Sequence, residues 1–411
     1  RYQLVVTAIG MAPVRAQLAR QGDEDRIVAA VRMSRTATQL AAVQVRGRAG
    51  PGQGGQGPQP PAAGGVERQL SSQLLERLPG NPGDVVASAA LAPGVVAVAG
   101  SDSTPAAFSV AAQPASQNNV TLDGATFLFG SLPQDGVRGT RVVTNAYDVS
   151  RGQFAGAQVA TTTRAGTALH EGSLTATGRD ARLQRADPAA AGFAQTSSQQ
   201  LLGGGAGGPV GRGGRVFYYA SGQADRRDDA QLSLLSATDG ALARLGTARD
   251  SIARLLALYA APPSGANAAF GDRATTNVST LARLDADLGD RHALTVRGDW
   301  RRTTQTGARV APLALPSTGG TLRAGGGGAL ASLTSLVGPF VNEGRVYASE
   351  ERQAATPYLD MPAGVVFVTS AADGAGGAGG AGVAAYQVGG SPTLPFAARR
   401  RLVEASDELS W

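Results

Sequence analysis

The sequence of 411 residues contains no cysteine and no lysine, and its only histidines are His170 and His292. Without cysteine the chain can form no disulfide scaffold, thiolate zinc site or thiol nucleophile. Two histidines leave almost no room for a histidine-built metal site or a catalytic triad, and we interpret both as structural or solvated residues. Aromatic residues make up only 5% and charged residues 17%, below the roughly 25% of charged residues usual in soluble domains.

Long apolar runs are also missing. The longest apolar stretch, residues 85–99, is interrupted by Pro93-Gly94, whereas a transmembrane helix needs about 20 apolar residues. A helical membrane protein is therefore excluded. A membrane β-barrel is not excluded, because its strands carry only an alternation of about ten residues each. No secretory signal is visible at Arg1.

The positive charge is carried by arginine alone. Thirty-seven basic and 31 acidic residues give a net charge of +6, which invites a nucleic-acid interpretation. The arginines are scattered, however, and the absence of lysine together with only three isoleucines indicates the codon bias of a GC-rich genome. We therefore predict no nucleic-acid partner.

The first two-fifths of the chain divide into three segments. Residues 1–38 alternate as short strands and are predicted to be part of a small β-sandwich. Residues 39–65 form a Gly/Pro-rich linker. Residues 66–167 are predicted to be compact, with a helix over Leu70–Leu78 and a second helix capped by Asn81. Strands are predicted at 120–122, 141–144 and 157–163.

Residues 168–411 read as strands separated by long polar or glycine-rich stretches. The clearest unit is a hairpin over 278–300 with its turn at Gly289-Asp290-Arg291. One face is mostly apolar and the other is charged, with Arg283, Arg297 and Arg301 on the charged face. In a soluble sandwich the apolar face would pack inward, whereas in an outer-membrane barrel it would face lipid. Long loops are expected at 303–333 and 369–398, and periodicity alone leaves both alternatives open.

Few residues suggest chemistry. Asp285 and Asp287 share a strand face and could hold Ca²⁺, but a polar row facing a lumen explains them better. The run 203–208 lacks the Gly-Lys-Ser/Thr ending of a phosphate loop. The stretch 211–215 resembles an RNA-binding RGG element, but a strand follows directly. We therefore predict no catalytic, cofactor-binding or metal-binding residues, and no enzyme.

Four blocks of the sequence occur in an order typical of one family. The first is 2–10 with 40–47, which resembles the end of a carboxypeptidase-regulatory-like sandwich and its connecting strand. The second, Leu78-Pro79 with 92–95, and the third, 117–124 with its Asp123-Gly124 turn, resemble a plug domain. The fourth, 207–219 with the later strands 283–285 and 341–343, resembles barrel strands. In this order the blocks resemble the Oar-like branch of the TonB-dependent outer-membrane receptors.

The resemblance implies a mainly β fold: an α+β plug domain followed by part of an antiparallel transmembrane β-barrel, preceded by the tail of a small β-sandwich. The implied domains are 1–38 (sandwich), 39–65 (linker), 66–167 (plug) and 168–411 (truncated barrel). A structural role in the plug is implied for Pro93, Gly94, Asp123, Gly124, Gly152, Gly156 and Gly166. Since a barrel of about 22 strands needs far more than residues 168–411, we expect a fragment of a longer product, with 408–411 beginning a strand.

The implied function is ligand uptake across the outer membrane, gated by the plug. The expected partners are outer-membrane lipid, the TonB energy-coupling complex and an extracellular ligand that the sequence does not identify. No TonB box is identifiable, so coupling stays open. The alternatives are a non-transporting surface protein for adhesion or export on the same scaffold, and a carbohydrate-binding β-protein.

Overall fold

The computed structural model describes residues 2–6, 14–18, 66–71, 84–98, 107–110, 113–127, 131–145, 157–183, 197–211, 213–231, 233–259, 273–311, 314–370 and 382–411. The chain divides into two units, residues 1–50 and 51–411. In the first unit, β1 (Tyr2–Val6) pairs antiparallel with β2 (Val14–Leu18). The strand pattern predicted near Ile27 and the linker strand at 40–45 lie outside the described residues.

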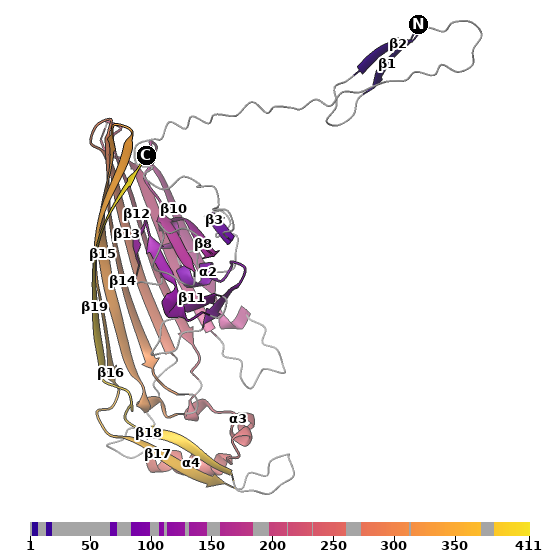
Figure 1. Ribbon diagram of the computed structural model, residues 1–411. Coiled ribbons are helices and arrows are strands. Elements are labelled where there is room, and N and C mark those ends of the chain that lie inside the picture. Colours follow the sequence, from indigo (N-terminus) through magenta and orange to yellow (C-terminus); the bar gives the residue numbers. More distant parts are fainter. Residues whose placement is uncertain are drawn as a thin grey trace, which may run out of the picture. The chain divides into compact units, whose positions relative to one another are not determined.

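Residues 66–167 form a small domain around a mixed sheet, which we call the mixed-sheet domain (Figure 1). Strands run in the order β3-β8-β9-β6-β7, and only β6 and β9 are parallel. A second sheet pairs β4 with β5, and α2 packs beside it. The bounds are β3 (Val66–Ser71), α2 (Val85–Ala89), β4 (Val95–Val98), β5 (Ala107–Val110), η1 (Ala115–Gln117), β6 (Asn119–Leu122), β7 (Ala125–Thr126), η2 (Gln134–Gly136), β8 (Val137–Asn145) and β9 (Gln158–Thr163).

The three strands predicted in this domain are confirmed as β6, β8 and β9, but both predicted helices differ. Leu70 does not begin a helix, because it lies fully buried in β3, opposite Thr140 of β8. The sheet pairing overrides the helical spacing of the leucines. The second helix exists but is shorter, and its cap is Asp84 rather than Asn81. The Asp84 carboxylate accepts hydrogen bonds from the backbone nitrogens of Val86 and Ala87 at 3.0 and 3.1 Å.

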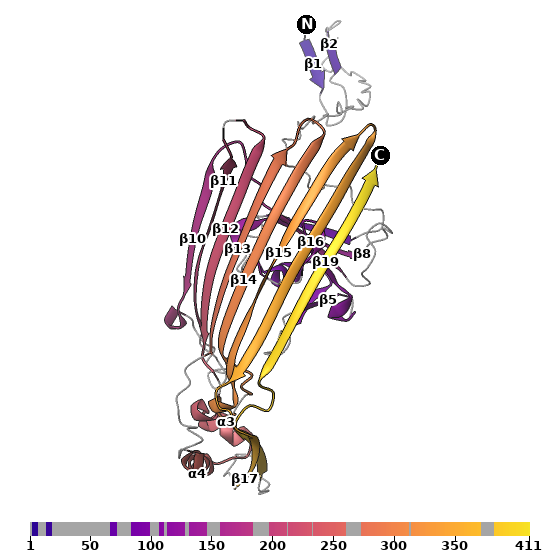
Figure 2. The ribbon, with the colours of Figure 1, turned by 90° about the vertical axis from the view of Figure 1, so that its left-hand side faces the viewer.

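The rest of the unit is built on an eight-stranded antiparallel sheet, which we call the wall (Figure 2). Its strand order is β10-β11-β12-β13-β14-β15-β16-β19. Short turns at 210–215, 288–291 and 338–339 lie at one end, and longer connections lie at the other. The bounds are β10 (Glu171–Arg179), β11 (Ser197–Pro209), β12 (Val216–Asp229), β13 (Arg273–Asp287), β14 (His292–Ala308), β15 (Gly320–Val337), β16 (Phe340–Pro357) and β19 (Phe396–Ser410).

The predicted hairpin is confirmed as β13 and β14, with both faces as expected. Leu284 pairs with Val296, and Arg283 pairs with Arg297. The charged face, which we call the inner face, packs against the mixed-sheet domain, and Arg297 is only 1% exposed. The apolar outer face stays open: Leu284 and Val296 are each 40% exposed and Trp300 46%. This arrangement contradicts the soluble-sandwich alternative, in which the apolar face is buried.

The long loop expected at 303–333 is wrong. Most of it belongs to β14 and β15, and only residues 309–319 connect them. Glycine is depleted in strands, so the glycine-rich part of 303–333 predicts a loop. In the wall, however, these glycines lie within β15, where a larger residue would collide with its neighbours. A Cβ on Gly328 would lie 2.3 Å from the Tyr347 hydroxyl, and one on Gly327 would lie 2.4 Å from the Asp299 carbonyl oxygen. The glycines make room for neighbouring strands and side chains.

The stretch 369–398 is likewise not a plain loop. It contains the end of β17 (Ala363–Ser370) and all of β18 (Gly382–Gly389), which pair antiparallel, and it reaches the start of β19. Together with η6 (Leu234–Ser236), α3 (Asp239–Arg244), α4 (Arg249–Tyr259) and η7 (Pro316–Thr318), this pair forms an end cluster with its own apolar core. Another short helical turn, η4 (Ala181–Leu183), follows β10.

Two further findings concern the second unit. Residues 408–410 do not begin a strand but complete β19, where Glu408 pairs with Glu343. Within the described ranges, no helix has the length and apolar character needed to cross a membrane.

Candidate functional site

The site is centred on the Asp-Gly turn between β6 and β7. Asp123 has φ +48° and Gly124 has φ +85°, the pair of positive values that a two-residue type I′ turn requires. The turn is anchored inside its own domain. The Asp123 carboxylate accepts hydrogen bonds from the Thr163 backbone nitrogen and hydroxyl, both at 2.8 Å. The carboxylate is thus held at a fixed place on the surface that meets the wall.

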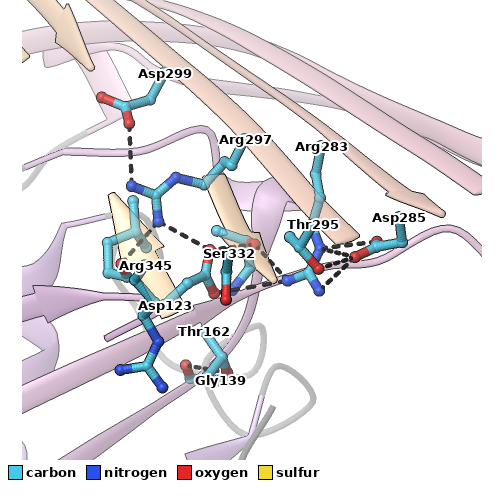
Figure 3. Close-up of polar contacts among 12 residues, drawn as sticks. Asp123, Gly139, Thr162, Arg283, Asp285, Thr295, Arg297, Asp299, Ser332 and Arg345 are labelled. Carbon is cyan, nitrogen blue, oxygen red and sulfur yellow. Dashed lines mark hydrogen bonds and ion pairs between the residues drawn. The ribbon is translucent and has the colours of Figure 1, made fainter. Parts of the chain in front are cut away.

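Arg297 of β14 reaches this carboxylate from the wall (Figure 3). Its Nη1 donates to Asp123 Oδ2 at 2.9 Å and to the Leu122 carbonyl oxygen at 2.8 Å. On the other side, its Nη2 contacts Asp299 Oδ1 at 3.4 Å. The guanidinium also lies over the Tyr347 ring, 5.7 Å from its centroid. Arg297 therefore joins the mixed-sheet domain to β14 and β16 of the wall through one buried cation.

Arg283 of β13 makes a parallel connection. Its Nη1 donates to the Thr163 hydroxyl at 3.1 Å and lies 3.7 Å from Asp123 Oδ1. Its Nε and Nη2 donate to Asp285, and Thr295 also donates to Asp285 at 2.7 Å. The Asp285 carboxylate is thus occupied by an arginine and a threonine. It serves as a positioning group in an ion-pair network on the inner face, where it is 1% exposed and so lies within the contact rather than in an open polar row.

The rest of the β6–β7 turn also contacts the wall. Ala125 packs with Leu330, Tyr347 and Leu402 in one small buried cluster. The Thr126 backbone nitrogen donates to Glu404 Oε2 at 3.1 Å. An ideal Cβ on Gly124 would lie 2.8 Å from an Arg345 nitrogen. A four-residue turn therefore contacts β14, β15, β16 and β19.

A second contact is made by η2 and the segment after β9. Tyr219 of β12 donates its hydroxyl proton to the Asp135 carbonyl oxygen at 2.7 Å. The Gln134 backbone nitrogen donates to Gln223 Oε1 at 2.9 Å. Gly166 lies against the Tyr218 backbone, where an added Cβ would be 2.3 Å from the carbonyl oxygen. The domain and the wall are thus joined by directed hydrogen bonds and ion pairs as well as by apolar contacts, such as that of Leu281 with the core of the mixed-sheet domain.

We call the contact of Asp123 with Arg283 and Arg297 the latch, and we expect it to weaken in acid. Burial alone would raise the pKa of Asp123, but Arg297, Arg283 and the Thr163 N–H outweigh it and hold that pKa below the usual 3.8. A carboxylate whose pKa is lowered on folding contributes stability above its unfolded pKa and loses that contribution as pH falls through the folded value. Thermal unfolding of the wild type and Asp123→Asn should therefore differ by a constant amount above about pH 5. The difference should shrink below pH 4, and a difference that grows in acid would contradict the assignment.

The structure brings only some of the predicted plug residues together. Asp123, Gly124 and Gly166 lie at the contact with the wall. Pro93 and Gly94 form an exposed turn before β4, with Gly94 at φ +79°. Gly152 and Gly156 lie outside the described residues. Away from the site, His292 Nδ1 lies 2.9 Å from the Ser335 hydroxyl, and the His170 ring lies 6.3 Å from that of Tyr218.

Sequence reasoning missed the partners of Asp123. The sequence places Arg283 and Arg297 on the charged strand face but does not show what that face contacts. A signal was present in the repeated Arg-x-Asp spacing of 283–285 and 297–299. Residues two apart share one strand face, so each arginine has a carboxylate beside it that can orient its guanidinium. The spacing could not reveal that both point at the same turn.

Comparison with known proteins gives matches in fold. No family model and no curated protein matches the sequence. A variant of the Pseudomonas aeruginosa ferric enterobactin receptor in complex with enterobactin is similar over 85% of this chain and 46% of its own, with a TM-score of 0.54 and 12% identity. The siderophore receptor PirA of Acinetobacter baumannii matches 82% of this chain and 44% of its own (TM-score 0.52, 12% identity). The outer-membrane transporter YddB of Escherichia coli matches 83% and 44% (0.51, 11%).

The chain therefore has the fold of outer-membrane barrel receptors. The neighbours are named as a ferric enterobactin receptor, a siderophore receptor and an outer-membrane transporter, and the resemblance predicted from the sequence is confirmed at the level of the fold. The chain spans less than half the length of these neighbours. The outer-membrane location expected from the sequence agrees with this fold. The Oar-like branch and the regulatory-like sandwich stay predictions.

Proposed function

We propose that this chain is part of a TonB-dependent outer-membrane receptor in which the mixed-sheet domain, residues 66–167, is the plug. The wall is then part of the barrel, and residues 1–38 belong to a periplasmic sandwich. The proposal is carried by the buried network that joins Asp123 to Arg283 and Arg297. Ligand uptake would require the plug to move from the wall at this contact.

The chemistry of the contact suits a latch that opens. Pairing two charges in a buried contact lowers the free energy little relative to the same charges separated in water, but it fixes their geometry strongly. When the domain leaves the wall, water can solvate the Asp123 carboxylate and both guanidiniums. An apolar interface of the same size would instead expose its surface to water and resist opening.

Location is tested by expressing the complete gene in a Gram-negative host and separating the membranes. We expect recovery in the outer-membrane fraction. Recovery in the soluble cytoplasm would contradict the proposal.

Gating is tested with a disulfide tether, for which the cysteine-free chain is a clean background. Ala125 and Leu330 lie in the same buried cluster on opposite sides of the contact. We expect the oxidised Ala125→Cys/Leu330→Cys variant to lose uptake of a probe and to regain it on reduction. Ferric enterobactin is the first probe, because one structural neighbour is bound to enterobactin.

Each single cysteine variant is the matched control, since it cannot form the tether. Full uptake with the disulfide completely formed would exclude plug movement at this contact. Uptake that depends on the TonB complex would exclude the alternative of a non-transporting surface protein, whereas no uptake by the untethered protein would favour it. A carbohydrate-binding role for residues 1–38 has no support in the described residues.

A further inference from the structure

The outer face of the wall changes from apolar residues to arginines at a similar distance from the short turns on several strands. Near the short turns, the outward-facing positions of the wall are mostly small or apolar. On β15 these positions are every second residue from Gly325 to Leu333, so the apolar band extends over nine residues. At about 3.4 Å a residue and about 40° of tilt, nine residues span about 23 Å, close to the apolar band of a barrel. The outward residues that follow directly on the apolar positions include Arg226 of β12, Arg302 of β14, Arg323 of β15 and Arg401 of β19, and on β16 Arg352 comes one outward position later, after Glu350.

The arginines beyond the apolar band converge on adjacent strands. Pairing places Arg302, Gly325, Arg352 and Arg399 in one row across β14, β15, β16 and β19. Trp300, Gly327, Glu350 and Arg401 form the next row, and Arg323 lies two residues from Gly325 on the same face. We call Arg302, Arg323, Arg352, Arg399 and Arg401 the arginine cluster. All five are exposed.

The cluster is only partly neutralised. Glu350 accepts hydrogen bonds from Arg352, Arg399 and Arg401 at 2.5, 2.6 and 2.8 Å. The side chains of Arg302 and Arg323 have no hydrogen bond or ion pair with any residue in the described part of the chain. Five cations around one carboxylate leave an excess of four positive charges on this patch. An anion from outside the chain would remove the repulsion among them.

A shallow groove lies directly below the cluster. One hollow of about 480 Å³ is lined by Gly327, Ala329 and Ala348, with Arg401 and Val403 at its side. A second, of about 790 Å³, continues across β14 to β11, with Gly298 and Trp300 at its near edge. Small residues form much of the lining, so the surface is hollowed where a hydrocarbon chain could lie. The exposed indole of Trp300 sits one outward position below Arg302, the level at which aromatic residues gather in barrels.

We propose that the arginine cluster binds the phosphate groups of an outer-leaflet lipid whose acyl chains lie in the groove below. The inference rests on the membrane orientation in the proposed function, which places the long connections outside the cell. Guanidinium groups match phosphate oxygens with paired hydrogen bonds. A lipid with net negative charge, unlike a zwitterionic one, would also offset the excess positive charge of the cluster. Charge and apolar surface are adjacent in the order that a phosphorylated lipid presents them.

The test compares the wild type with Arg302→Gln/Arg323→Gln, because both residues lack a partner among the described residues. The matched control is Arg227→Gln/Arg400→Gln, which removes the same charge from the opposite, inner face at a similar level. Each protein is expressed from the complete gene and purified in detergent. Binding of hexa-acylated lipid A, bearing two phosphates, is then measured by native mass spectrometry.

We expect the outer-face variant to bind lipid A about 10- to 30-fold more weakly, because each lost arginine should weaken binding by roughly three- to fivefold. The control variant should bind like the wild type, and dephosphorylated lipid A should bind all three equally weakly. Equal binding of lipid A to both variants would overturn the inference. Membrane fractionation of the same strains keeps the two proposals separable, because a protein that reaches the outer membrane but does not discriminate lipid A refutes only the lipid site.

Discussion

Replacing Arg297 with methionine should detach the mixed-sheet domain from the wall. The substitution keeps an apolar stem of similar length but leaves Asp123, the Leu122 carbonyl oxygen and Asp299 without their shared cation. Removing one partner of a buried ion pair costs about 3–5 kcal/mol, because the remaining charge stays buried and unpaired. We expect cleavage by trypsin within residues 66–167 at a protease concentration that leaves the wild type intact.

Two comparisons make this result specific. Arg400→Met makes the same chemical change at an exposed position and should alter stability by less than about 0.5 kcal/mol. Combining Arg297→Met with Asp123→Asn should cost less than the sum of the two single changes, because the double variant no longer buries the Asp123 charge. If the two changes are additive, the pair is not coupled and the latch is assigned to the wrong residues.

Gly166→Ala should disrupt the second contact through shape alone. Its new methyl group would lie 2.3 Å from the Tyr218 carbonyl oxygen and 2.8 Å from the Tyr218 nitrogen. Both are backbone atoms of β12, so neither can rotate away as a flexible side chain would. Overpacking of this kind typically costs about 1–3 kcal/mol. We expect a lower midpoint of thermal unfolding and greater protease sensitivity of the mixed-sheet domain.

Gly178→Ala is the matched control, because a Cβ on Gly178 of β10 meets no atom within 4 Å. It should leave the unfolding midpoint nearly unchanged or raise it slightly, since alanine restricts the unfolded chain more than glycine does. Equal effects at both positions would mean that the loss at Gly166 comes from backbone conformation rather than from contact with Tyr218.

The sequence was most informative where the spacing of apolar and polar residues matches the two-residue repeat of the strand that forms. The alternation over 278–300 predicted both strands, their turn and their two faces, because side chains alternate strictly along a strand. It failed at Leu70, where pairing with β8 outweighs a helical spacing of leucines. It failed again at Gly327 and Gly328, because the space they provide is needed by residues on neighbouring strands. Contacts between distant segments decide such positions, and no local period records them.

The candidate site was predicted in its parts but not in its assembly. The Asp123-Gly124 turn was identified from its resemblance to a plug segment, and Arg283 and Arg297 were placed on the polar face. The two arginines lie more than 150 residues beyond Asp123 in the sequence. Their meeting depends on how the mixed-sheet domain docks on the wall, which a single sequence does not specify.

The end cluster has a consequence for how such a protein can diversify. Leu242, Ile252 and Tyr386 belong to a core that α3, α4 and β17–β18 share with one another and with η7, separate from the core of the mixed-sheet domain. Substitutions on the outside of this cluster, such as at the exposed Leu258 or Phe367, leave both the latch and the strand register untouched. Substitutions can therefore change the surface at this end of the wall without lowering the stability of the latch or of the paired strands.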